Sequence, residues 1–343
     1  MLYTTSSLSQ DIVIPITDHA QIGDARRRSV KLAASLGFDE VLAGKTAIAV
    51  TELASNLAKY SPGGVLLLKA LKQGGRNGLE IRSLDKGPGM SNVSMCLEDG
   101  YSTSGSAGTG LGAVSRLATQ FDIYSMPQLG TAILARLWGE PPSKYSVLTP
   151  LEFGAVCLPL STETHNGDGW ATWHTLDLSR VLVVDGLGHG PLAETAATET
   201  IRIFLANPDL TLARLVETLH TGLTHTRGVS LAVAEIDYAR QVIHYVGVGN
   251  ISGAIVFAEG QRGLVSLSGT VGHTIRKAIE FTYPYSPGEL LVLHSDGITR
   301  HWNIGRYPGL FHRHPSLIAG RIYYDYARGT DDLTIWVGRL PAR

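Results

Sequence analysis

The sequence Val181-Leu182-Val183-Val184-Asp185-Gly186-Leu187-Gly188-His189-Gly190 joins an apolar run to an acidic, glycine-rich turn. Four consecutive aliphatic residues, most of them β-branched, predict a short strand. The aspartate and the glycines predict a tight turn where that strand ends. An Asp-Gly pair after a strand is most often only a turn. The stretch therefore indicates a site only if similar stretches occur elsewhere in the chain.

Further apolar runs meet acidic residues in the same way. The run Leu290–Leu293 is followed closely by Asp296, and Asp331 precedes the run Leu333–Val337, while an earlier acid, Asp168, stands in a glycine-rich stretch. Carboxylates that converge from several strands repel one another unless cations neutralise them. Oxygen ligands without Cys or paired His favour Mg²⁺ or Mn²⁺ over zinc. The sequence therefore predicts a carboxylate metal cluster.

Composition limits what else the protein does. Its 343 residues suggest two domains, and 29 Lys+Arg against 30 Asp+Glu leave a net charge of -1, which disfavours a nucleic-acid partner. Cys96 and Cys157 lie far apart, which excludes a disulfide framework and a thiolate zinc site. The N-terminus lacks a signal-peptide pattern, and the apolar runs are only strand-sized. We therefore expect a cytoplasmic protein with no membrane partner.

The best domain boundary is Gly139–Lys144, where a Pro pair separates strand-like segments. We expect a first domain at residues 1–140 and a second at residues 145–343. Helical and strand patterns mix in the first domain, and short β-runs with two helical stretches dominate the second. The predicted class is therefore α/β in the broad sense (α+β), with a mostly antiparallel, helix-covered sheet system in the second domain.

A helix predicted over roughly 41–60 carries the first polar motif of the N-terminal part. Its apolar positions recur at helical spacing and predict a buried stripe of Val50, Leu53, Leu57 and Tyr60. Glu52 and Asn56 are four residues apart, so they lie one above the other on the flank of that stripe. Such a pair is weak evidence alone, because exposed helices carry such pairs by chance.

Two glycine-rich stretches follow this helix. A strand over Leu79–Leu84 leads to Asp85 in a glycine-rich turn, and the loop Gly105–Gly112 directly precedes an apolar helix. Backbone N–H groups of such a loop, with the helix N-terminus, form an anion cradle. A Rossmann fingerprint is excluded because a polar loop precedes the glycines, and a Walker A motif is excluded because Gly-Lys-Ser/Thr is missing.

The order Glu52-x-x-x-Asn56, Asp85-x-Gly87-x-Gly89, Gly108-x-Gly110-x-Gly112 resembles the GHKL ATPase/kinase family. The stretch Asp99–Gly105 is more narrowly similar to the RsbT-type switch-protein serine kinases, and the resemblance covers residues 10–138. It implies a two-layer, Bergerat-type ATP-binding fold with Glu52 as general base. It also implies Mg²⁺ on Asn56, the adenine amino group on Asp85, and a phosphate lid. The implied nucleotide-binding residues are Asn56, Asp85, Gly87, Gly89, Gly108, Thr109, Gly110, Leu111 and Gly112.

The acidic motifs of the second domain resemble the SpoIIE-type metal-dependent serine/threonine phosphatases, and the short form is similar to the RsbX type. The motifs occur in the family's order over residues 147–340: Asp185–Gly190, Arg227-Gly228, Val248–Asn250, His294–Gly297 and Asp331–Thr334. The resemblance implies an α-β-β-α sandwich and a metal-activated hydroxide that attacks phosphoserine. The implied metal ligands are Asp168, Asp185, the Gly186 carbonyl, Asp296 and Asp331.

This sequence departs from the phosphatase pattern at two places. Asn166-Gly167-Asp168 replaces the commoner Gly-Gly-Asp, and the early phosphate-binding Arg of some relatives has no counterpart. His189 could donate a proton, but a structural role in its loop is the better interpretation.

Together the resemblances imply a bifunctional partner-switching regulator. An ATP-dependent kinase would phosphorylate Ser or Thr of a STAS-domain antagonist or scaffold protein, and an Mg²⁺- or Mn²⁺-dependent phosphatase would dephosphorylate a STAS partner. One alternative makes the N-terminal domain a non-catalytic, nucleotide-gated module that sequesters a partner. Another joins a small-molecule ATPase to an unrelated metal hydrolase. Glu52 argues against the first alternative, and the 99–105 stretch argues against the second.

Overall fold

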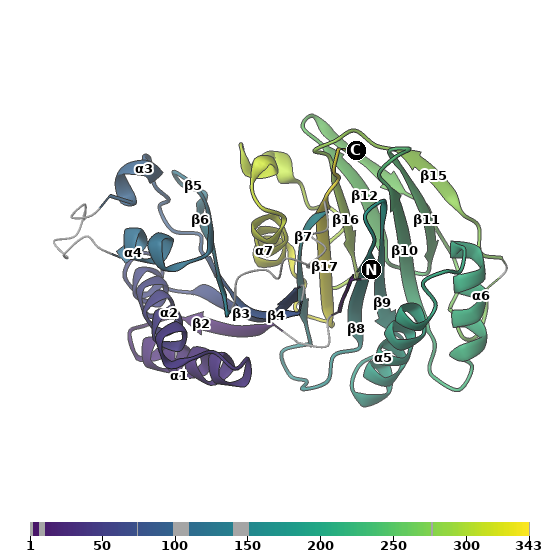
Figure 1. Cartoon of the computed structure of the whole chain (residues 1–343), viewed down its shortest axis with the longest axis horizontal. Coiled ribbons are helices and arrows are strands. Elements are labelled where there is room, and N and C mark those ends of the chain that lie inside the picture. The colour runs from purple at the N-terminus through teal and green to yellow at the C-terminus, as the bar shows by residue number, and fades with distance from the viewer. Residues whose placement is uncertain are drawn as a thin grey trace. The chain divides into compact units, whose positions relative to one another are not determined.

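The computed structural model describes residues 3–6, 11–73, 75–98, 110–139, 151–275 and 277–342. The chain divides into two compact units. We call Gln10–Ser146 the N-terminal unit, and Met1–Ser9 with Val147–Arg343 the C-terminal unit (Figure 1). Residues 140–150, which contain most of the expected domain boundary, lie outside the described residues. Each unit mixes helices and strands, as expected.

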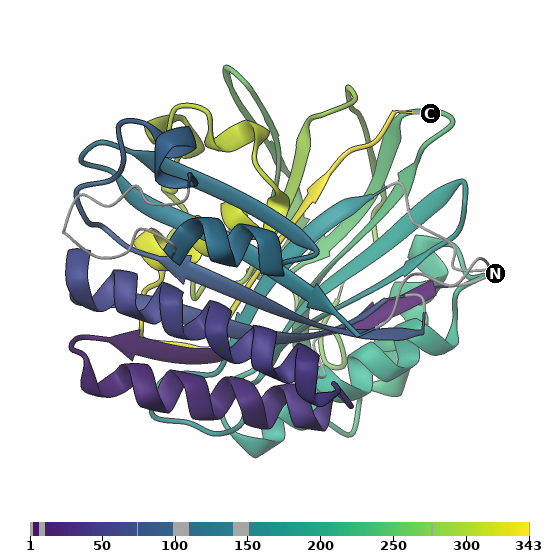
Figure 2. The same cartoon turned by 60° about the vertical axis from the view of Figure 1, so that its left-hand side comes forward.

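The N-terminal unit is one antiparallel sheet with helices on one face (Figure 2). The strand order is β2-β3-β4-β6-β5. A core of aliphatic side chains, including Ile14, Leu53 and Ile81, lies between the sheet and the helices. Its elements are β2 (Ile12–Ile16), α1 (Ala20–Ser35), α2 (Glu40–Tyr60), β3 (Gly64–Gln73), β4 (Arg76–Leu84), α3 (Val93–Cys96), α4 (Gly110–Leu117), β5 (Gln120–Met126) and β6 (Gly130–Trp138).

Helix α2 carries the first nucleotide motif. The Asp39 side chain caps its start by accepting a 2.8 Å hydrogen bond from the Leu42 N–H. Val50, Leu53 and Leu57 are buried as the spacing predicts, but Tyr60 is 42% exposed, so its place in the buried stripe is wrong. Tyr60 is the last helical residue, where the chain turns away toward β3. Glu52 and Asn56 are half-buried.

The C-terminal unit stacks two sheets. The first has the order β1-β8-β9-β10-β11-β14, with β15 also on β11, and the second has the order β13-β12-β16-β17-β7. The strands are β1 (Tyr3–Ser6), β7 (Glu152–Leu158), β8 (Asp168–His174), β9 (Leu178–Gly186), β10 (Val229–Asp237), β11 (Val242–Val248), β12 (Ser252–Phe257), β13 (Gly260–Leu264), β14 (Ser266–Leu267), β15 (Phe281–Pro284), β16 (Leu290–His294) and β17 (Leu333–Arg339).

Side chains alternate between the two faces of each strand, which builds a layered core. Val181 and Val183 join Leu291 and Trp336 in a cluster between the two sheets. Leu182 and its neighbours on that face pack instead against α5 (Pro191–Ala206) and α6 (Leu212–Gly222).

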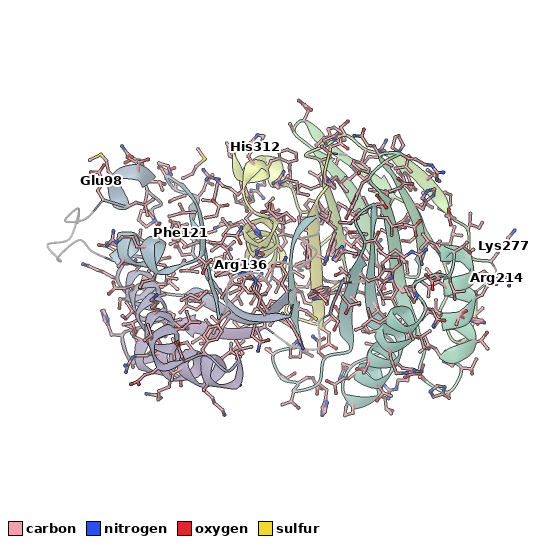
Figure 3. The ribbon with its side chains drawn as sticks, in the orientation of Figure 1. Glu98, Phe121, Arg136, Arg214, Lys277 and His312 are labelled. Atoms are coloured by element: carbon pink, nitrogen blue, oxygen red, sulfur yellow. The ribbon has the colours of Figure 1, made fainter. Side chains whose placement is uncertain are left out.

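Helices cover both outer faces of this sandwich. Arg214, on the solvent side of α6, has an exposed side chain (Figure 3). Helix α7 (Pro315–Tyr326) packs on β7 and β17, following the short 3₁₀ helices η1 (Ile304–Arg306) and η2 (Leu310–His312). The layers therefore run helix, sheet, sheet, helix.

The first strand of the chain lies in the C-terminal unit. Strand β1 pairs antiparallel with β8, from Tyr3 opposite His174 to Ser6 opposite Ala171. The first domain expected from the sequence, residues 1–140, includes these residues. Their pairing corrects that assignment, because β8 would otherwise present an unpaired row of backbone N–H and C=O groups. The N-terminal unit is thus inserted between two segments of the C-terminal unit.

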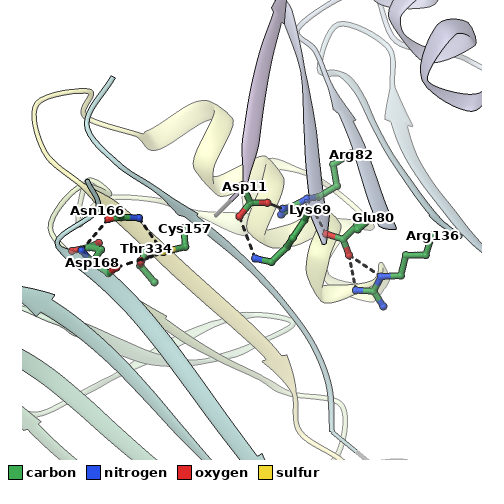
Figure 4. A network of polar contacts seen from close by, with 9 residues as sticks. All are labelled: Asp11, Lys69, Glu80, Arg82, Arg136, Cys157, Asn166, Asp168 and Thr334. Atoms are coloured by element: carbon green, nitrogen blue, oxygen red, sulfur yellow. Dashed lines mark hydrogen bonds and ion pairs between the residues drawn. The ribbon is translucent and has the colours of Figure 1, made fainter. Parts of the chain in front are cut away.

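Buried charges pair with one another across the sheet of the N-terminal unit (Figure 4). Lys69 Nζ lies 3.1 Å from Asp11 Oδ2, and Arg82 also contacts Asp11. Arg136 Nη2 lies 2.7 Å from Glu80 Oε2. Pairing of this kind is what allows charged groups to be buried.

Among the described helices, none is long and apolar enough to cross a membrane.

Candidate functional sites

Two predicted acidic residues face each other at one edge of the C-terminal sandwich. Asp168 begins β8, Asp185 lies near the end of β9, and the two are directly opposite in the antiparallel register. Asp168 is two residues from Trp170 on β8, and Asp185 is two residues from Val183 on β9. Each aspartate therefore lies on the same face of its strand as a residue of the core between the sheets. Both side chains therefore point between the two sheets. Like charges placed opposite each other are destabilising, so this arrangement needs a compensating partner.

The second sheet brings its acidic residues to the same place. Asp296 follows β16, and Asp331 precedes β17, which pairs with β16. The Ser295 N–H donates to the Thr334 carbonyl at 3.0 Å, and the Thr334 N–H donates to Ser295 Oγ at 2.9 Å. These reciprocal bonds hold the turn after β16 against the start of β17. Asp296 and Asp331 are thereby kept at one edge.

Asn250 connects the two sheets. Its side-chain amide donates to Asp185 Oδ2 at 2.9 Å and to Asp296 Oδ2 at 3.0 Å. Within the described part of the chain, its own Oδ1 is buried without a hydrogen-bond partner. From the sequence, Asn250 is only part of the Val248–Asn250 motif and has no predicted role. The available signal was its place directly after an apolar strand, beside Gly249.

Asn166 holds Asp168 in place. Its Oδ1 accepts from the Asp168 N–H at 2.9 Å, and its amide nitrogen lies 3.3 Å from Cys157 Sγ, which also receives the Thr334 hydroxyl at 3.2 Å (Figure 4). The departure from Gly-Gly-Asp thus adds a side chain that fixes the start of β8. Asn166 and Asp168 are both buried, at 5% and 6% exposure.

Asp331 and Asp332 differ in what they contact. Asp332 is buried and accepts from the Leu160 and Gly167 N–H groups, each at 2.7 Å. It therefore ties together the loops around the site. Asp331 is exposed, and its Oδ1 accepts from the Asp332 N–H at 2.9 Å. Of the two, Asp331 is the one that is accessible to a ligand.

The electrostatics of the cluster favour protons or cations. Burial, followed by the charge of Asp185, raises the pKa of Asp168 well above its usual range, against a hydrogen bond from Ser295. Burial also raises the pKa of Asp185 to about 7, opposed by Asn250 and reinforced by Asp296. Partial burial raises the pKa of Asp331. Each shift reflects a carboxylate that is costly to leave charged without a counter-ion.

The donor set fits a divalent cation with oxygen ligands. Within the described ranges, no three Asp, Glu, His or Cys side chains already converge as a metal-binding group. However, Asp168 Oδ2 is buried without a partner there, and Asp185 and Asp296 share a single amide donor. A cation would satisfy the orphaned oxygen and remove the repulsion. Carboxylate and carbonyl oxygens are the ligands that Mg²⁺ and Mn²⁺ prefer.

In the N-terminal unit, Glu52 lies beside the start of α4. A Cβ atom placed on Gly110, the first residue of α4, would be 3.0 Å from Glu52 Oε2. Among the residues that the structure describes, neither Glu52 nor Asn56 has a side-chain hydrogen bond or ion pair. The N–H groups at the start of a helix attract anions. The helix N-terminus and a carboxylate therefore adjoin here, and the catalytic role of Glu52 stays a prediction.

Three expected lid residues are described, and two are not. Gly110, Leu111 and Gly112 form the first turn of α4; Leu111 packs against the core and Gly112 is buried. Gly108 and Thr109 lie outside the described residues, as does the 99–105 stretch that carries the narrower resemblance.

Asp85 is engaged by its own turn. Its Oδ1 accepts from the Gly87 N–H at 2.7 Å and from the Thr131 N–H at 3.2 Å. The aspartate thus caps the turn after β4 and joins it to β6. A role in adenine recognition stays a prediction.

Gly89 allows the same turn to approach the β5–β6 hairpin. Its φ is +70°, and a Cβ atom there would lie 1.9 Å from the Met126 carbonyl oxygen. The Met90 N–H donates to Ser125 Oγ at 2.8 Å, and the Gln128 N–H donates to the Pro88 carbonyl at 2.8 Å. The turn and the hairpin are therefore joined on both sides of this glycine.

We expect Gly89→Ala to destabilise the turn and the hairpin by more than the ~1–2 kcal/mol that left-handed backbone costs an alanine. The added carbon meets backbone that cannot move freely. Hydrogen exchange of the β4 and β6 amides in the full chain measures this loss. Gly75→Ala is the matched control, because Gly75 has φ +80° and nothing within 4 Å of the added Cβ. Equal protection in the two variants would contradict the close approach.

Comparisons with known proteins place each unit. The family model described as Stage II sporulation protein E (SpoIIE) matches residues 177–339. The serine/threonine-protein kinase RsbT of Bacillus subtilis (strain 168) is 37% identical over 114 residues, which are 33% of this chain and 86% of RsbT.

Solved structures resemble the chain as well. A chain from the bacterial stressosome, described as a modular system adapted to control secondary messenger signaling, has a TM-score of 0.52 and 26% identity, over 55% of this chain and 99% of that one. RsbX in complex with magnesium has a TM-score of 0.50 and 20% identity, over 55% and 95%. The PP2C phosphatase domain of SpoIIE from Bacillus subtilis, with part of its regulatory domain, has a TM-score of 0.50 and 14% identity, over 94% and 93%. The last two likenesses concern the fold alone.

The fold of each unit, the acidic edge of the C-terminal unit and these likenesses support the same assignment. The chain belongs to the RsbT kinase family through its N-terminal unit, which is fused to a unit that matches the SpoIIE family model and has a PP2C-like fold.

Proposed function

We propose that the chain is a bifunctional regulator of partner switching. Its N-terminal unit phosphorylates a Ser or Thr of a STAS-domain antagonist or scaffold protein with ATP. Its C-terminal unit hydrolyses the phosphoester of a STAS partner. The observation that carries the proposal is the Asp168–Asp185 pair, linked through Asn250 to Asp296, on one chain with an RsbT-like unit.

In the proposed phosphatase, the side chains at the acidic edge would hold the metal ion and orient one another. Asp168, Asp185, Asp296, Asp331 and the Gly186 carbonyl would hold Mg²⁺ or Mn²⁺. The bound cation supplies Lewis-acid activation of water and of the phosphoester. The solved complex of the similar RsbX with magnesium is consistent with this choice of cation.

Residues beside these ligands fix their orientation through hydrogen bonds. Asn250 orients Asp185 and Asp296 with one amide, and Asn166 holds the backbone of Asp168. Asp332 fixes the loops at Leu160 and Gly167. Such supporting contacts matter because misplaced ligands lose affinity and activity.

In the proposed kinase, catalysis depends mainly on positioning of the reactants and on neutralisation of charge. Phosphoryl transfer depends on alignment of the acceptor and neutralisation of the phosphates. The N-terminus of α4 would attract the phosphates, and Asn56 would hold the nucleotide's Mg²⁺. Glu52 adjoins the start of α4, where it would take the proton of the acceptor hydroxyl.

Asp296→Asn tests the bifunctional proposal directly. The substitution removes a ligand charge from the phosphatase while leaving every residue of the N-terminal unit unchanged. With Mg-ATP and a binding STAS partner, phosphorylated partner should therefore accumulate above the wild-type steady state. Quantitative mass spectrometry of the partner over time measures this accumulation.

The wild-type chain supplies the control. After ATP is removed, phosphorylated partner should decay with wild type but persist with Asp296→Asn. If a partner binds both proteins and neither ever phosphorylates it, the kinase claim fails. The N-terminal unit is then better described as a nucleotide-gated binding module.

A further inference from the structure

An arginine that the proposed mechanism does not use lies at the acidic edge of the C-terminal unit. Arg227 precedes Gly228 and β10, whose first residue, Val229, lies opposite Gly186 in the register. The Leu187 N–H donates to the Gly228 carbonyl at 3.1 Å. The backbone directly after Arg227 is therefore tied to the turn that follows Asp185.

The guanidinium of Arg227 rests against that same turn. Gly188 has φ +85°, and a Cβ atom there would lie 2.9 Å from Arg227 Nη1. Only a glycine leaves this room in this backbone conformation. Gly188 is three residues after Asp185, so the cation sits beside the turn that carries a proposed metal ligand.

Arg227 differs from several exposed arginines of this unit in having free donors. Arg202, Arg214 and Arg240 each contact a carboxylate three residues away. Arg227 is exposed, and no ion pair or side-chain hydrogen bond is found for it among the described residues. A guanidinium without a partner keeps all its N–H groups available to an incoming anion.

Two other cationic groups at this edge are already engaged. Arg328 Nη1 donates to the Asp296 carbonyl at 3.3 Å. His189 Nδ1 lies 2.9 Å from Glu163 Oε1. Unlike these two groups, Arg227 is free to contact an anion that approaches the acidic edge.

We propose that Arg227 binds the phosphoryl group of the phosphoserine or phosphothreonine substrate through its non-bridging oxygens. The inference rests on the phosphatase function proposed above. The planar guanidinium fork matches two phosphate oxygens at once, which a point charge does not.

Inorganic phosphate is the probe, and the full chain loaded with Mn²⁺ is the protein. Isothermal titration calorimetry should show that Arg227→Gln weakens phosphate binding by about 10-fold to 100-fold, the usual weight of a charged hydrogen bond. Arg227→Lys should weaken it less, because the charge remains and only the fork is lost. Arg240→Gln is the matched control: Arg240 is exposed and its partner, Asp237, lies at the far end of β10.

Two further measurements separate phosphate recognition from damage to the site. The Mn²⁺ affinity and the unfolding temperature should be the same in Arg227→Gln and wild type. With a phosphorylated STAS protein, KM should rise in Arg227→Gln as phosphate binding weakens.

The outcomes distinguish this inference from the proposed function. Wild-type affinity for phosphate in Arg227→Gln, or no phosphate binding by the wild type, would overturn the role of Arg227, whatever the enzyme hydrolyses. Arg227-dependent phosphate binding by a chain that hydrolyses no phosphoprotein would support the role of Arg227 and refute the phosphatase proposal.

Discussion

Asp185→Asn is expected to lower the phosphatase turnover of the chain by about 10³-fold, since a metal contributes several kcal/mol of transition-state stabilisation. Asparagine keeps the shape of the side chain and can still accept from Asn250, whose amide lies 2.9 Å from Asp185 Oδ2. The loss therefore reports the missing charge rather than a missing contact. Release of inorganic phosphate from a phosphorylated STAS partner, with saturating Mn²⁺, measures it.

Asp177→Asn is the matched control for this change. Asp177 is exposed in the turn between β8 and β9, at the opposite end of both strands from Asp168 and Asp185. Its substitution should leave turnover unchanged. If Asp185→Asn also retained wild-type turnover, or if wild type hydrolysed the phosphoprotein in excess EDTA, the carboxylate metal site would be the wrong assignment.

Glu52→Ala is expected to cost about 10²-fold to 10⁴-fold in kinase rate, the usual contribution of a general base. ATP affinity should change little, because Glu52 adjoins the start of α4 without supplying the predicted Mg²⁺ or adenine contacts. Dephosphorylation should proceed normally, since the acidic edge lies in the other unit. Single-turnover phosphorylation of a STAS partner and equilibrium binding of ATP separate these quantities.

Three variants calibrate the Glu52 result. Glu40→Ala alters an exposed glutamate on the first turn of the same helix and should leave the rate intact. Asn56→Ala should instead weaken Mg-dependent ATP binding. Asp85→Asn should weaken the selectivity for adenine. A Glu52→Ala protein that phosphorylates its partner at the wild-type rate would remove Glu52 from the mechanism.

Local patterns predict much of the acidic site because its residues lie at strand ends. Asp185, Asp296 and Asp331 each adjoin an apolar run, and the structure places each run in a buried strand. Strand periodicity does not state which residues face each other across a ladder. The pairing of Asp168 with Asp185 depends on the turn between β8 and β9, which sets the register.

Contacts between distant segments are the part that the sequence does not reveal. The bridge from Asn250 to Asp185 and Asp296 exists only because two sheets stack face to face. The pairing of β1 with β8 is equally non-local. Strand β1 has only four residues, most of them polar, so no hydrophobic periodicity indicates it in the sequence. Tyr60 shows the opposite error, where helical spacing continued to the last turn although the core did not.

The pairing of β1 with β8 also sets an order of events during synthesis. Strand β1 ends at Ser6, and β8 begins at Asp168, so the ribosome completes the whole N-terminal unit before β1 has a partner. At about 5–20 residues per second, that interval is roughly 8–30 s, long enough for a domain to fold on the emerging chain. The N-terminal unit therefore has time to fold while the C-terminal unit is still being translated. In the bifunctional regulator proposed above, kinase activity would then appear on each new chain before phosphatase activity, while β1 still awaits its partner strand.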